Sequence, residues 1–364
     1  MDFEHIPHAA PVPSATRDEA LANPGFGTVF TDHMVVIDYD ANQPDAVGGG
    51  WHTAKVCPRE PIALDPAAAV LHYAQEIFEG LKAYRQEDGG IALFRPEANA
   101  ARFNKSAERM AMPHLPEELF LESIRRLLAV DKDWFPTVEG GSLYLRPFMF
   151  ASEAFLGVRP AKQYKYILIA SPAGNYFKSG APAVKIWVSQ DYVRAAPGGT
   201  GAAKTGGNYA ASLVPQAEAI EQGCDQVVFL DAVEKKWIEE LGGMNLFFVF
   251  DDGTVVTPPL TGTILPGITR DSLIRLLREE GLEVREEPYS IDQWREDAGS
   301  GRLVETMACG TAAVVTAVGT VAGRDGEFTI GGGGPGQLTS KLREKLVGIQ
   351  RGRADDTHGW VTRV

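Results

Sequence analysis

A loop built almost entirely of small residues around one lysine is the feature that most limits what this chain can fold into. Seven of the ten residues 198–207 are glycine or alanine, and Lys204 is the only long side chain among them. Glycine lets another group approach the backbone closely, at a cost in conformational entropy. The composition of this loop therefore predicts a binding site around Lys204 and not a solvated surface lysine.

Apolar runs and turn signals predict a mixed α+β chain in which this loop follows a strand. Proline and alanine are frequent in residues 1–25, which we expect to form a loose arm. Strands are predicted at 31–38, 143–150, 164–171, 184–189, 226–231, 245–250, 303–307 and 312–321, with a hairpin of 76–84 and 91–94. Helices are predicted at 97–109, 117–130, 209–222, 273–280 and 339–348.

The length of 364 residues exceeds that of one average domain, and turn-forming residues cluster at 177–182. We therefore expect a smaller N-terminal α+β domain over residues 1–178 and an interdomain linker at 179–184. The larger domain, residues 185–364, would contain the lysine loop.

Charge and cysteine usage exclude several classes of protein. A net charge of −13 and a pI near 5.1 make nucleic acid and anionic membranes poor partners. The three cysteines, Cys57, Cys224 and Cys309, are too far apart for a disulfide framework or a CxxC metal site. Neither an apolar run of membrane-spanning length nor a basic start followed by an apolar stretch is present. We expect a cytoplasmic protein without a metal.

Two chemistries place a lysine in such a loop. Residues 198–205 nearly match the phosphate-binding P-loop, with 227–231 as its acidic partner strand, but Ala203 replaces the second glycine. The pair Gly206–Gly207 also disfavours the helix that should begin there. The alternative is a lysine whose amine attacks a carbonyl, which needs a buried or cationic setting. Tyr209 would then reach the hydroxyl of a flat cofactor ring.

The segment 194–209, RAAPGGTGAAKTGGNY, resembles the lysine segment of fold-type IV pyridoxal phosphate enzymes, and most of all that of the branched-chain aminotransferases. Seven further blocks resemble that family in its own order: FGTVFTDHM, LHYAQEIFEGLKAY, LFRP, LYLRP, ELGGMN, LPGITR and CGTAA. The resemblance implies the two-domain fold of D-amino acid aminotransferase-like proteins, with a mixed sheet or barrel in the larger domain. It also implies ping-pong transfer of the amino group of leucine, isoleucine or valine to 2-oxoglutarate.

A pyridoxal phosphate enzyme needs a lysine that links to the cofactor, an acidic group at the ring nitrogen, a phosphate-binding site and a binding site for the substrate. The resemblance implies that Lys204 forms the Schiff base and moves protons, and that Glu240 faces the ring nitrogen. Its neighbour Glu239 is expected on the surface. The remaining cofactor contacts that the resemblance implies are Arg102, Arg194, Tyr209, Ile268, Thr269, Cys309 and Gly310. The amides of Ile268 and Thr269 would also sit at the start of a helix, where anions bind.

The expected substrate site combines an apolar pocket with two anion-binding features. The turn after the strand 303–307 presents backbone amides that suit a carboxylate. Arg146 would receive the γ-carboxylate of glutamate, since burying that charge unpaired is costly. The resemblance takes Tyr73, Leu156 and Val158 from the neighbouring subunit of a homodimer. The full set is Phe30, Tyr73, Phe78, Tyr144, Arg146, Leu156, Val158, Thr311 and Ala312.

Other functions remain as alternatives. The nearest are a D-amino acid aminotransferase and an aminodeoxychorismate lyase, against which the long N-terminal region and the FEG and LYLRP blocks argue. A P-loop nucleotidase and a non-enzymatic binding protein are more remote, and a binding protein would leave Lys204 unexplained.

Overall fold

The computed structural model describes residues 1–43, 46–174 and 183–364. The chain divides by its internal packing into two compact units. Unit 1 comprises Met1–Lys178, Ala203–Gly206 and Ile349–Val364, and unit 2 comprises Ser179–Ala202 and Gly207–Gly348. The predicted linker 179–184 lies mostly outside the described residues, so the predicted domain boundaries stay a prediction.

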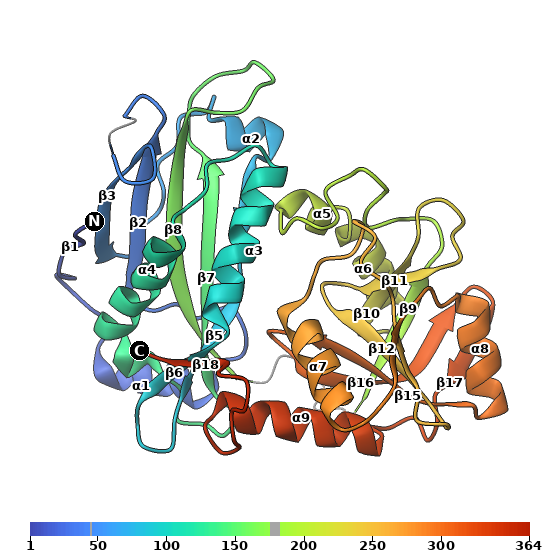
Figure 1. Ribbon diagram of the computed structural model, residues 1–364. Helices are drawn as coiled ribbons and strands as arrows, with labels where there is room; N and C mark the ends of the chain where they lie inside the picture. Colours follow the sequence, from blue (N-terminus) through green and yellow to red (C-terminus); the bar gives the residue numbers. More distant parts are fainter. Residues whose placement is uncertain (44–45, 175–182) are drawn as a thin grey trace. The chain divides into compact units, whose positions relative to one another are not determined.

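Unit 1 is built on a nine-stranded sheet in the described part of the chain, with α3 and α4 on one face (Figure 1). The strand order is β1-β3-β2-β8-β7-β5-β6-β18, and β4 pairs with β7. The strands are β1 (Glu4–His5), β2 (His33–Asp40), β3 (Trp51–Pro58), β4 (Glu76–Phe78), β5 (Leu81–Arg85), β6 (Ile91–Phe94), β7 (Ser142–Ala151), β8 (Gln163–Ala173) and β18 (Val361–Arg363). The helices are α1 (Ser14–Ala22), α2 (Ala69–Tyr73), α3 (Pro96–Arg109), α4 (Glu117–Val130) and the 3₁₀ turn η1 (Lys132–Trp134).

The core of unit 1 lies where α3 and α4 meet the sheet. Phe103 of α3, Phe120 of α4 and Tyr166 of β8 are fully buried and pack against one another with ring centroids 5.5–6.2 Å apart. The buried hydroxyl of Tyr166 lies 2.9 Å from Ser123 Oγ, so its polar end is satisfied. This packing fixes α3, which carries Arg102 and Ser106.

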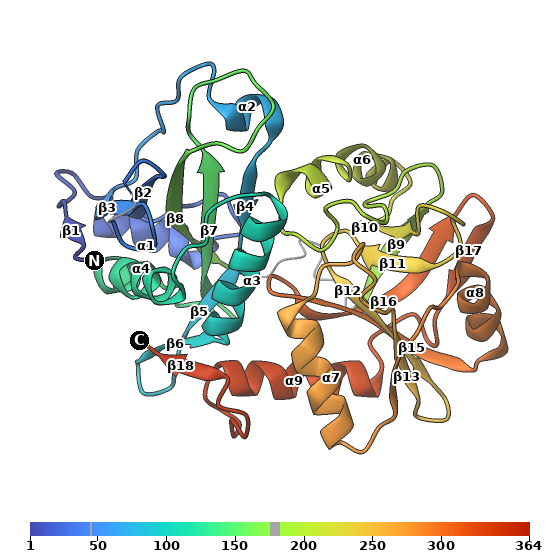
Figure 2. The same ribbon diagram turned by 45° about the horizontal axis from the view of Figure 1, so that its top comes forward.

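Unit 2 contains a second nine-stranded sheet among the described residues, of order β11-β10-β9-β16-β15-β12-β13-β14, with β17 paired to β16 (Figure 2). Every residue of β12 is buried, which explains its continuous apolar run. The strands are β9 (Ala183–Ser189), β10 (Gln226–Leu230), β11 (Ile238–Leu241), β12 (Asn245–Phe250), β13 (Val255–Thr257), β14 (Val284–Glu286), β15 (Leu303–Gly310), β16 (Val314–Gly323) and β17 (Gly326–Thr329). The helices are α5 (Gly206–Ala210), α6 (Leu213–Glu221), α7 (Ile268–Glu279), α8 (Ile291–Ser300) and α9 (Gln337–Gln350).

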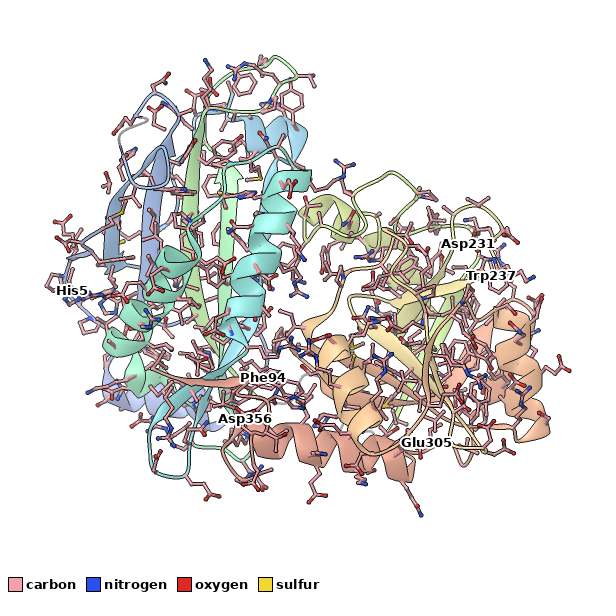
Figure 3. The ribbon with its side chains drawn as sticks, in the orientation of Figure 1. His5, Phe94, Asp231, Trp237, Glu305 and Asp356 are labelled. Carbon is pink, nitrogen blue, oxygen red and sulfur yellow. The ribbon has the colours of Figure 1, made fainter. Side chains whose placement is uncertain are left out.

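The turn that leads into β11 is organised by one carboxylate. Asp231, labelled with Trp237 in Figure 3, accepts hydrogen bonds from the backbone N–H groups of Val233, Glu234, Lys236 and Trp237. Burial alone would raise the pKa of Asp231, but these donors lower it to about 2. The carboxylate that the P-loop alternative assigned to the acidic strand is therefore used to hold the backbone before β11.

Several sequence predictions are confirmed, and others are wrong for identifiable reasons. The helices at 97–109 and 117–130 are α3 and α4, and β5 forms a hairpin with β6. The predicted strand 76–84 is interrupted at Glu79–Gly80, where a Cβ on Gly80 would lie 2.1 Å from the Tyr144 hydroxyl. Residues 1–25 are not wholly a loose arm, because they contain α1, which buries Leu21.

The predicted helix 209–222 is two helices, and its first turn begins earlier than expected. A continuous helix would need an N–H on Pro215 to reach the carbonyl of Ala211, and proline has none, so α6 restarts at Leu213. The expectation that Gly206–Gly207 would prevent a helix from beginning there is wrong, since α5 begins at Gly206. Among the described residues, no helix is both long and apolar enough to cross a membrane.

Helix α8 was missed by periodicity, yet its start has a clear signal. Ser290 accepts a hydrogen bond from Gln293 N (3.1 Å), and the Gln293 side chain accepts one from Ser290 N (3.1 Å), which is a capping box. The helix buries Trp294 completely.

Replacing the capping serine should weaken the protein measurably. Ser290→Ala removes an N-cap acceptor, and we expect the free energy of unfolding, measured by urea denaturation, to fall by about 1 kcal/mol. Ser300→Ala, at the exposed end of the same helix, is the control and should change it by less than about 0.5 kcal/mol. Equal effects of the two substitutions would contradict the role of the cap.

Candidate active site

The backbone of Lys204 is held on both sides within unit 1. Lys204 N donates to the buried hydroxyl of Ser106 on α3 (2.9 Å), and Lys204 O accepts from Phe78 N at the end of β4 (3.0 Å). A strand and a helix of the same core thus fix the position of the lysine. The side chain then starts from a defined point, which is what a reacting amine requires.

Two cations share one aromatic ring next to this anchor. Lys204 Nζ lies 4.8 Å and Arg146 Cζ 4.7 Å from the centroid of the Phe78 ring, within the range of cation–π attraction. Arg146 Nη2 also donates to the Tyr144 hydroxyl (3.1 Å). Arg146 Nε is buried and has no hydrogen-bond partner among the described residues. A buried donor without an acceptor is unfavourable, so an anion beside Arg146 would be stabilised.

The carboxylate of Glu76 explains why α5 begins at a pair of glycines. One of its oxygens accepts hydrogen bonds from Gly206 N and from Thr205 Oγ1, the latter at 3.4 Å. A Cβ on Gly206 would lie 2.5 Å from the same oxygen. Burial raises the pKa of Glu76, although these donors and the charge of Arg146 oppose the rise. The tertiary contact therefore overrides the poor helix propensity of glycine.

Arg102 forms a buried ion pair. Its Nε and Nη2 donate to the two carboxylate oxygens of Glu79 at 2.7 and 2.8 Å, and Asn99 Nδ2 donates to Glu79 at 2.7 Å. Burial alone would raise the pKa of Glu79, but the charge and hydrogen bonds of Arg102 hold that pKa below its usual range. Glu79 thus fixes one edge of the guanidinium that we predicted to contact phosphate.

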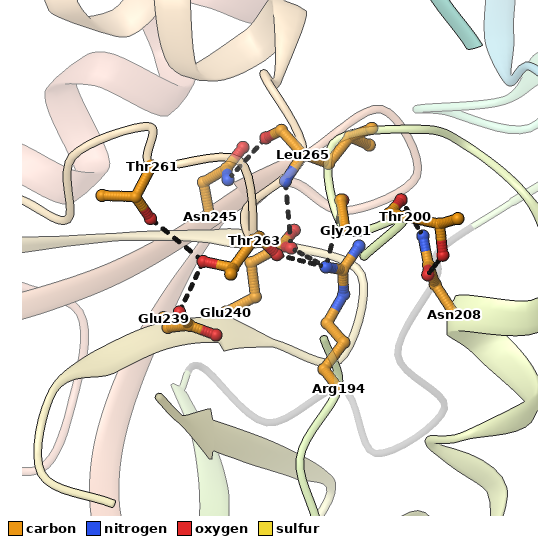
Figure 4. Close-up of polar contacts among 10 residues, drawn as sticks. All are labelled: Arg194, Thr200, Gly201, Asn208, Glu239, Glu240, Asn245, Thr261, Thr263 and Leu265. Carbon is orange, nitrogen blue, oxygen red and sulfur yellow. Dashed lines mark hydrogen bonds and ion pairs between the residues drawn. The ribbon is translucent and has the colours of Figure 1, made fainter. Parts of the chain in front are cut away.

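Unit 2 places a second buried guanidinium beside a second buried carboxylate (Figure 4). Arg194 Nη1 lies 2.7 Å from Glu240 Oε2 and donates to the carbonyl oxygen of Thr263 (2.9 Å). Leu265 N donates to the same oxygen of Glu240 (3.1 Å). Glu240 is 1% exposed, so its charge needs this compensation. Arg194 and Glu240, which were predicted separately, lie together.

Glu239 is buried, and the expectation that it lies on the surface is wrong. All four residues of β11 are buried. Thr263 Oγ1 donates to Glu239 Oε1 at 2.5 Å. Successive side chains of a strand point to opposite faces, so Glu239 and Glu240 face away from each other. The loop that contains Thr263 covers β11 and donates hydrogen bonds to both glutamates.

The other predicted residues of unit 2 lie at ends of elements. Ile268 and Thr269 open α7, whose N-cap residue Gly267 provides no side-chain cap. Cys309 and Gly310 end β15, and burial raises the pKa of Cys309 to about 12. Thr311 and Ala312 form the turn between β15 and β16. Tyr209 is half-buried in α5, and a Cβ on Gly243 would lie 3.4 Å from its ring.

The three residues that we assigned to a neighbouring subunit lie on the surface of unit 1. The hydroxyl of Tyr73 donates to the carbonyl oxygen of Leu156. Leu156 is 66% and Val158 89% exposed, which is high for aliphatic side chains. The ring of Phe30 is half-buried and lies 5.1 Å from the guanidinium of Arg59.

Sequence reasoning missed Glu76, Glu79, Ser106 and Thr263. The two glutamates had a usable signal, because a charged residue inside an otherwise apolar strand block must find a partner when it is buried. Ser106 and Thr263 had none, since their contacts come from distant parts of the sequence.

The chain matches a known protein family and relatives of known name. Residues 76–320 match the family described as amino-transferase class IV. The chain is 58% identical to the branched-chain-amino-acid aminotransferases of Mycolicibacterium smegmatis and Mycobacterium tuberculosis, over 100% of this chain and 98% of each relative.

Solved structures agree with this match. The branched-chain amino acid aminotransferase from Escherichia coli is similar with a TM-score of 0.72 and 30% identity, covering 91% of this chain and 98% of that one. A branched-chain amino acid aminotransferase of T.th., solved with pyridoxamine 5′-phosphate, has a TM-score of 0.71 and 29% identity, covering 90% and 97%. The mixed α/β fold predicted from the sequence is confirmed.

Removal of the Glu76 acceptor should loosen the segment after the lysine. In Glu76→Ala, we expect amide hydrogen exchange in a peptide spanning 203–210 to become about tenfold faster or more, because a hydrogen bond to a charged group is lost. Glu76→Gln keeps an acceptor oxygen and should exchange more slowly than the alanine variant. The exposed Glu87→Ala is the control, and equal exchange in all four proteins would contradict the clamp.

Proposed function

The chain belongs to the amino-transferase class IV family, and from this premise we propose that it acts as a branched-chain-amino-acid aminotransferase. It transfers the amino group of L-leucine, L-isoleucine or L-valine reversibly to 2-oxoglutarate. The observation that carries this proposal is the grouping of Lys204, Phe78 and Arg146, which combines an anchored amine, an apolar surface and a cation. The full-length identity with enzymes of that name supports it.

The family uses pyridoxal phosphate. When bound, this cofactor supplies an aldehyde that a lysine amine can link to and a ring that takes up the electron pair released at the substrate α-carbon. The donor set of the chain fits it. Glu240 provides a buried carboxylate for a protonated ring nitrogen, and the backbone N–H groups at the start of α7 suit a phosphate. We propose as cofactor residues Lys204, Glu240, Arg102, Arg194, Tyr209, Ile268, Thr269, Cys309 and Gly310.

Lys204 moves the proton on which the reaction depends. With the cofactor bound, its amine Nζ would accept the proton from the substrate α-carbon and deliver it to the cofactor carbon that carried the aldehyde, which is general base and then general acid catalysis by one group. The bonds to Ser106 and Phe78 keep the origin of this side chain fixed through both steps.

Polar residues of the proposed substrate site bind the carboxylates of the substrate, and apolar residues contact its side chain. The backbone amides of Thr311 and Ala312 bind the α-carboxylate. Arg146 binds the γ-carboxylate of glutamate or 2-oxoglutarate. Its buried Nε, which has no hydrogen-bond partner in the described part of the chain, supports this role. The apolar side chain of leucine contacts Phe30, Phe78, Tyr144 and, from the partner subunit, Tyr73, Leu156 and Val158.

We further infer a cytoplasmic homodimer whose active sites are shared between subunits, without nucleic-acid or membrane partners. The high exposure of Leu156 and Val158 supports the dimer, since a partner would cover both. The acidic net charge supports the absence of polyanionic partners.

Loss of the proposed γ-carboxylate receptor should separate the two kinds of substrate. In Arg146→Met, we expect KM for glutamate and 2-oxoglutarate to rise roughly tenfold or more and KM for leucine to change little, because only the dicarboxylates lose a charged hydrogen bond. Steady-state kinetics with the exposed Arg324→Met as control decide it. Equal losses would contradict the role of Arg146, and no glutamate formation from leucine and 2-oxoglutarate by the unaltered enzyme would contradict the function itself.

Neutralising the proposed partner of the ring nitrogen should slow the reaction without releasing the cofactor. In Glu240→Gln, we expect kcat to fall at least tenfold, about 1.4 kcal/mol of barrier. The measurement is kcat at saturating cofactor, with the exposed Glu221→Gln as control. An unchanged kcat would mean that another group serves the ring nitrogen.

A further inference from the structure

Two consecutive glutamates on β11 are buried, and of these two only Glu240 forms an ion pair with a described residue. Glu240 is paired with Arg194 at 2.7 Å. Glu239 accepts one hydrogen bond, from the hydroxyl of Thr263, and its Oε2 is buried without a partner among the described residues. The proposed function gives Glu240 a task but leaves Glu239 without one.

One loop engages both glutamates, as Figure 4 shows. Thr263 Oγ1 donates to Glu239, and Leu265 N donates to Glu240, so alternate residues of the loop bond to consecutive residues of the strand. Because β11 is the edge strand of its sheet, a loop that passes its edge reaches side chains on either face. The hydroxyl of Thr261 lies 3.0 Å from that of Thr263 and extends the same network.

The backbone of Thr263 faces the lysine loop and its arginine. Thr263 O accepts a hydrogen bond from Arg194 Nη1 (2.9 Å), which also donates to Gly201 O (3.3 Å). A Cβ on Gly201 would lie 2.4 Å from Thr263 O and 2.6 Å from Thr263 Cα. No side chain fits at residue 201, so the glycine there is required by the close approach of Thr263.

We propose that Glu239 is a positioning residue for the cofactor: through Thr263 it sets the placement of Arg194 and of the lysine loop at Gly201. The proposal rests on the proposed function, because it takes Arg194 as a phosphate-binding group. Glu239 itself touches neither substrate nor cofactor. Glu239 Oε1 accepts a hydrogen bond from the Thr263 hydroxyl, which restrains residue 263. The backbone of Thr263 in turn contacts Arg194 and Gly201.

The role needs an acceptor oxygen and not a negative charge. Burial raises the pKa of Glu239, the charge of Asp231 raises it further, and the Thr263 hydroxyl and Arg194 lower it only in part. Glutamine has the same shape and keeps the acceptor oxygen. A substitution by glutamine should therefore preserve the function, and a truncation should not.

The test compares matched pairs of variants in cofactor binding. In Glu239→Ala and Thr263→Val, we expect the Kd for pyridoxal 5′-phosphate, measured by absorbance titration of the cofactor-free protein, to rise about tenfold or more. In Glu239→Gln and Thr263→Ser, which keep the acceptor and the hydroxyl, it should stay within about twofold. The double variant Glu239→Ala/Thr263→Val should bind no worse than either single variant, since the two groups act as one contact.

A second probe separates positioning from general stability. Pyridoxal, which lacks the phosphate, should show a much smaller loss of affinity in Glu239→Ala, because Arg194 acts on the phosphate. If Glu239→Ala does not fold, the comparison of Thr263→Val with Thr263→Ser carries the test. Equal cofactor affinity in all variants, or a loss in Glu239→Gln as large as that in Glu239→Ala, would overturn the proposal. Failure of the unaltered protein to bind the cofactor would instead overturn the proposed function.

The charge state gives an independent readout. When folding raises the pKa of a carboxyl, that group contributes its full stabilisation at a pH below its pKa in the unfolded chain. The contribution is lost as the pH rises through the pKa of the folded protein. Glutamine does not titrate. The Tm of Glu239→Gln relative to the unaltered protein should therefore increase as the pH rises above 4.5, the ordinary pKa of glutamate, and a constant or falling difference would contradict a raised pKa at Glu239.

Discussion

The hydrogen bonds on both sides of Lys204 are the interactions on which the rest of the site depends. The backbone N–H of Lys204 donates to the Ser106 hydroxyl at 2.9 Å, and the backbone N–H of Phe78 donates to the Lys204 carbonyl oxygen at 3.0 Å. Both partners belong to elements of one buried core, so the lysine is fixed by the same packing that stabilises the unit. A loop rich in glycine is otherwise poorly ordered. These contacts hold the backbone of Lys204 in one position, from which its side-chain amine can react.

Two buried carboxylates of this protein are each paired with a buried guanidinium. Glu79 with Arg102 and Glu240 with Arg194 follow the same plan, with distances of 2.7 Å in each pair. Removing one member of such a pair is strongly destabilising, because the other is left buried and uncompensated. The pairs thus keep two arginines in fixed positions before any anion binds, which lowers the cost of ordering them on binding.

Local sequence predicted some parts of this arrangement and not others, and the difference is physical. Helices α3 and α4 were predicted because their apolar faces repeat with helical period. The start of α5 was not, because Glu76 is 130 residues away from Gly206 and outweighs glycine propensity. The burial of Glu239 was missed for the same reason, since the loop that covers it comes from a later segment. The local sequence pointed to a binding role for Lys204 and for the helix start at Ile268 and Thr269, and family resemblance supplied the proposed roles of most other site residues.

The proposed function depends on Lys204 as the residue that binds the cofactor covalently. The most direct measurement is borohydride reduction of the protein loaded with pyridoxal 5′-phosphate, followed by peptide mass spectrometry. We expect the peptide containing Lys204 to carry the reduced cofactor and the other lysine peptides to carry none. Attachment to a different lysine, or no attachment at all in a protein that has bound the cofactor, would contradict it.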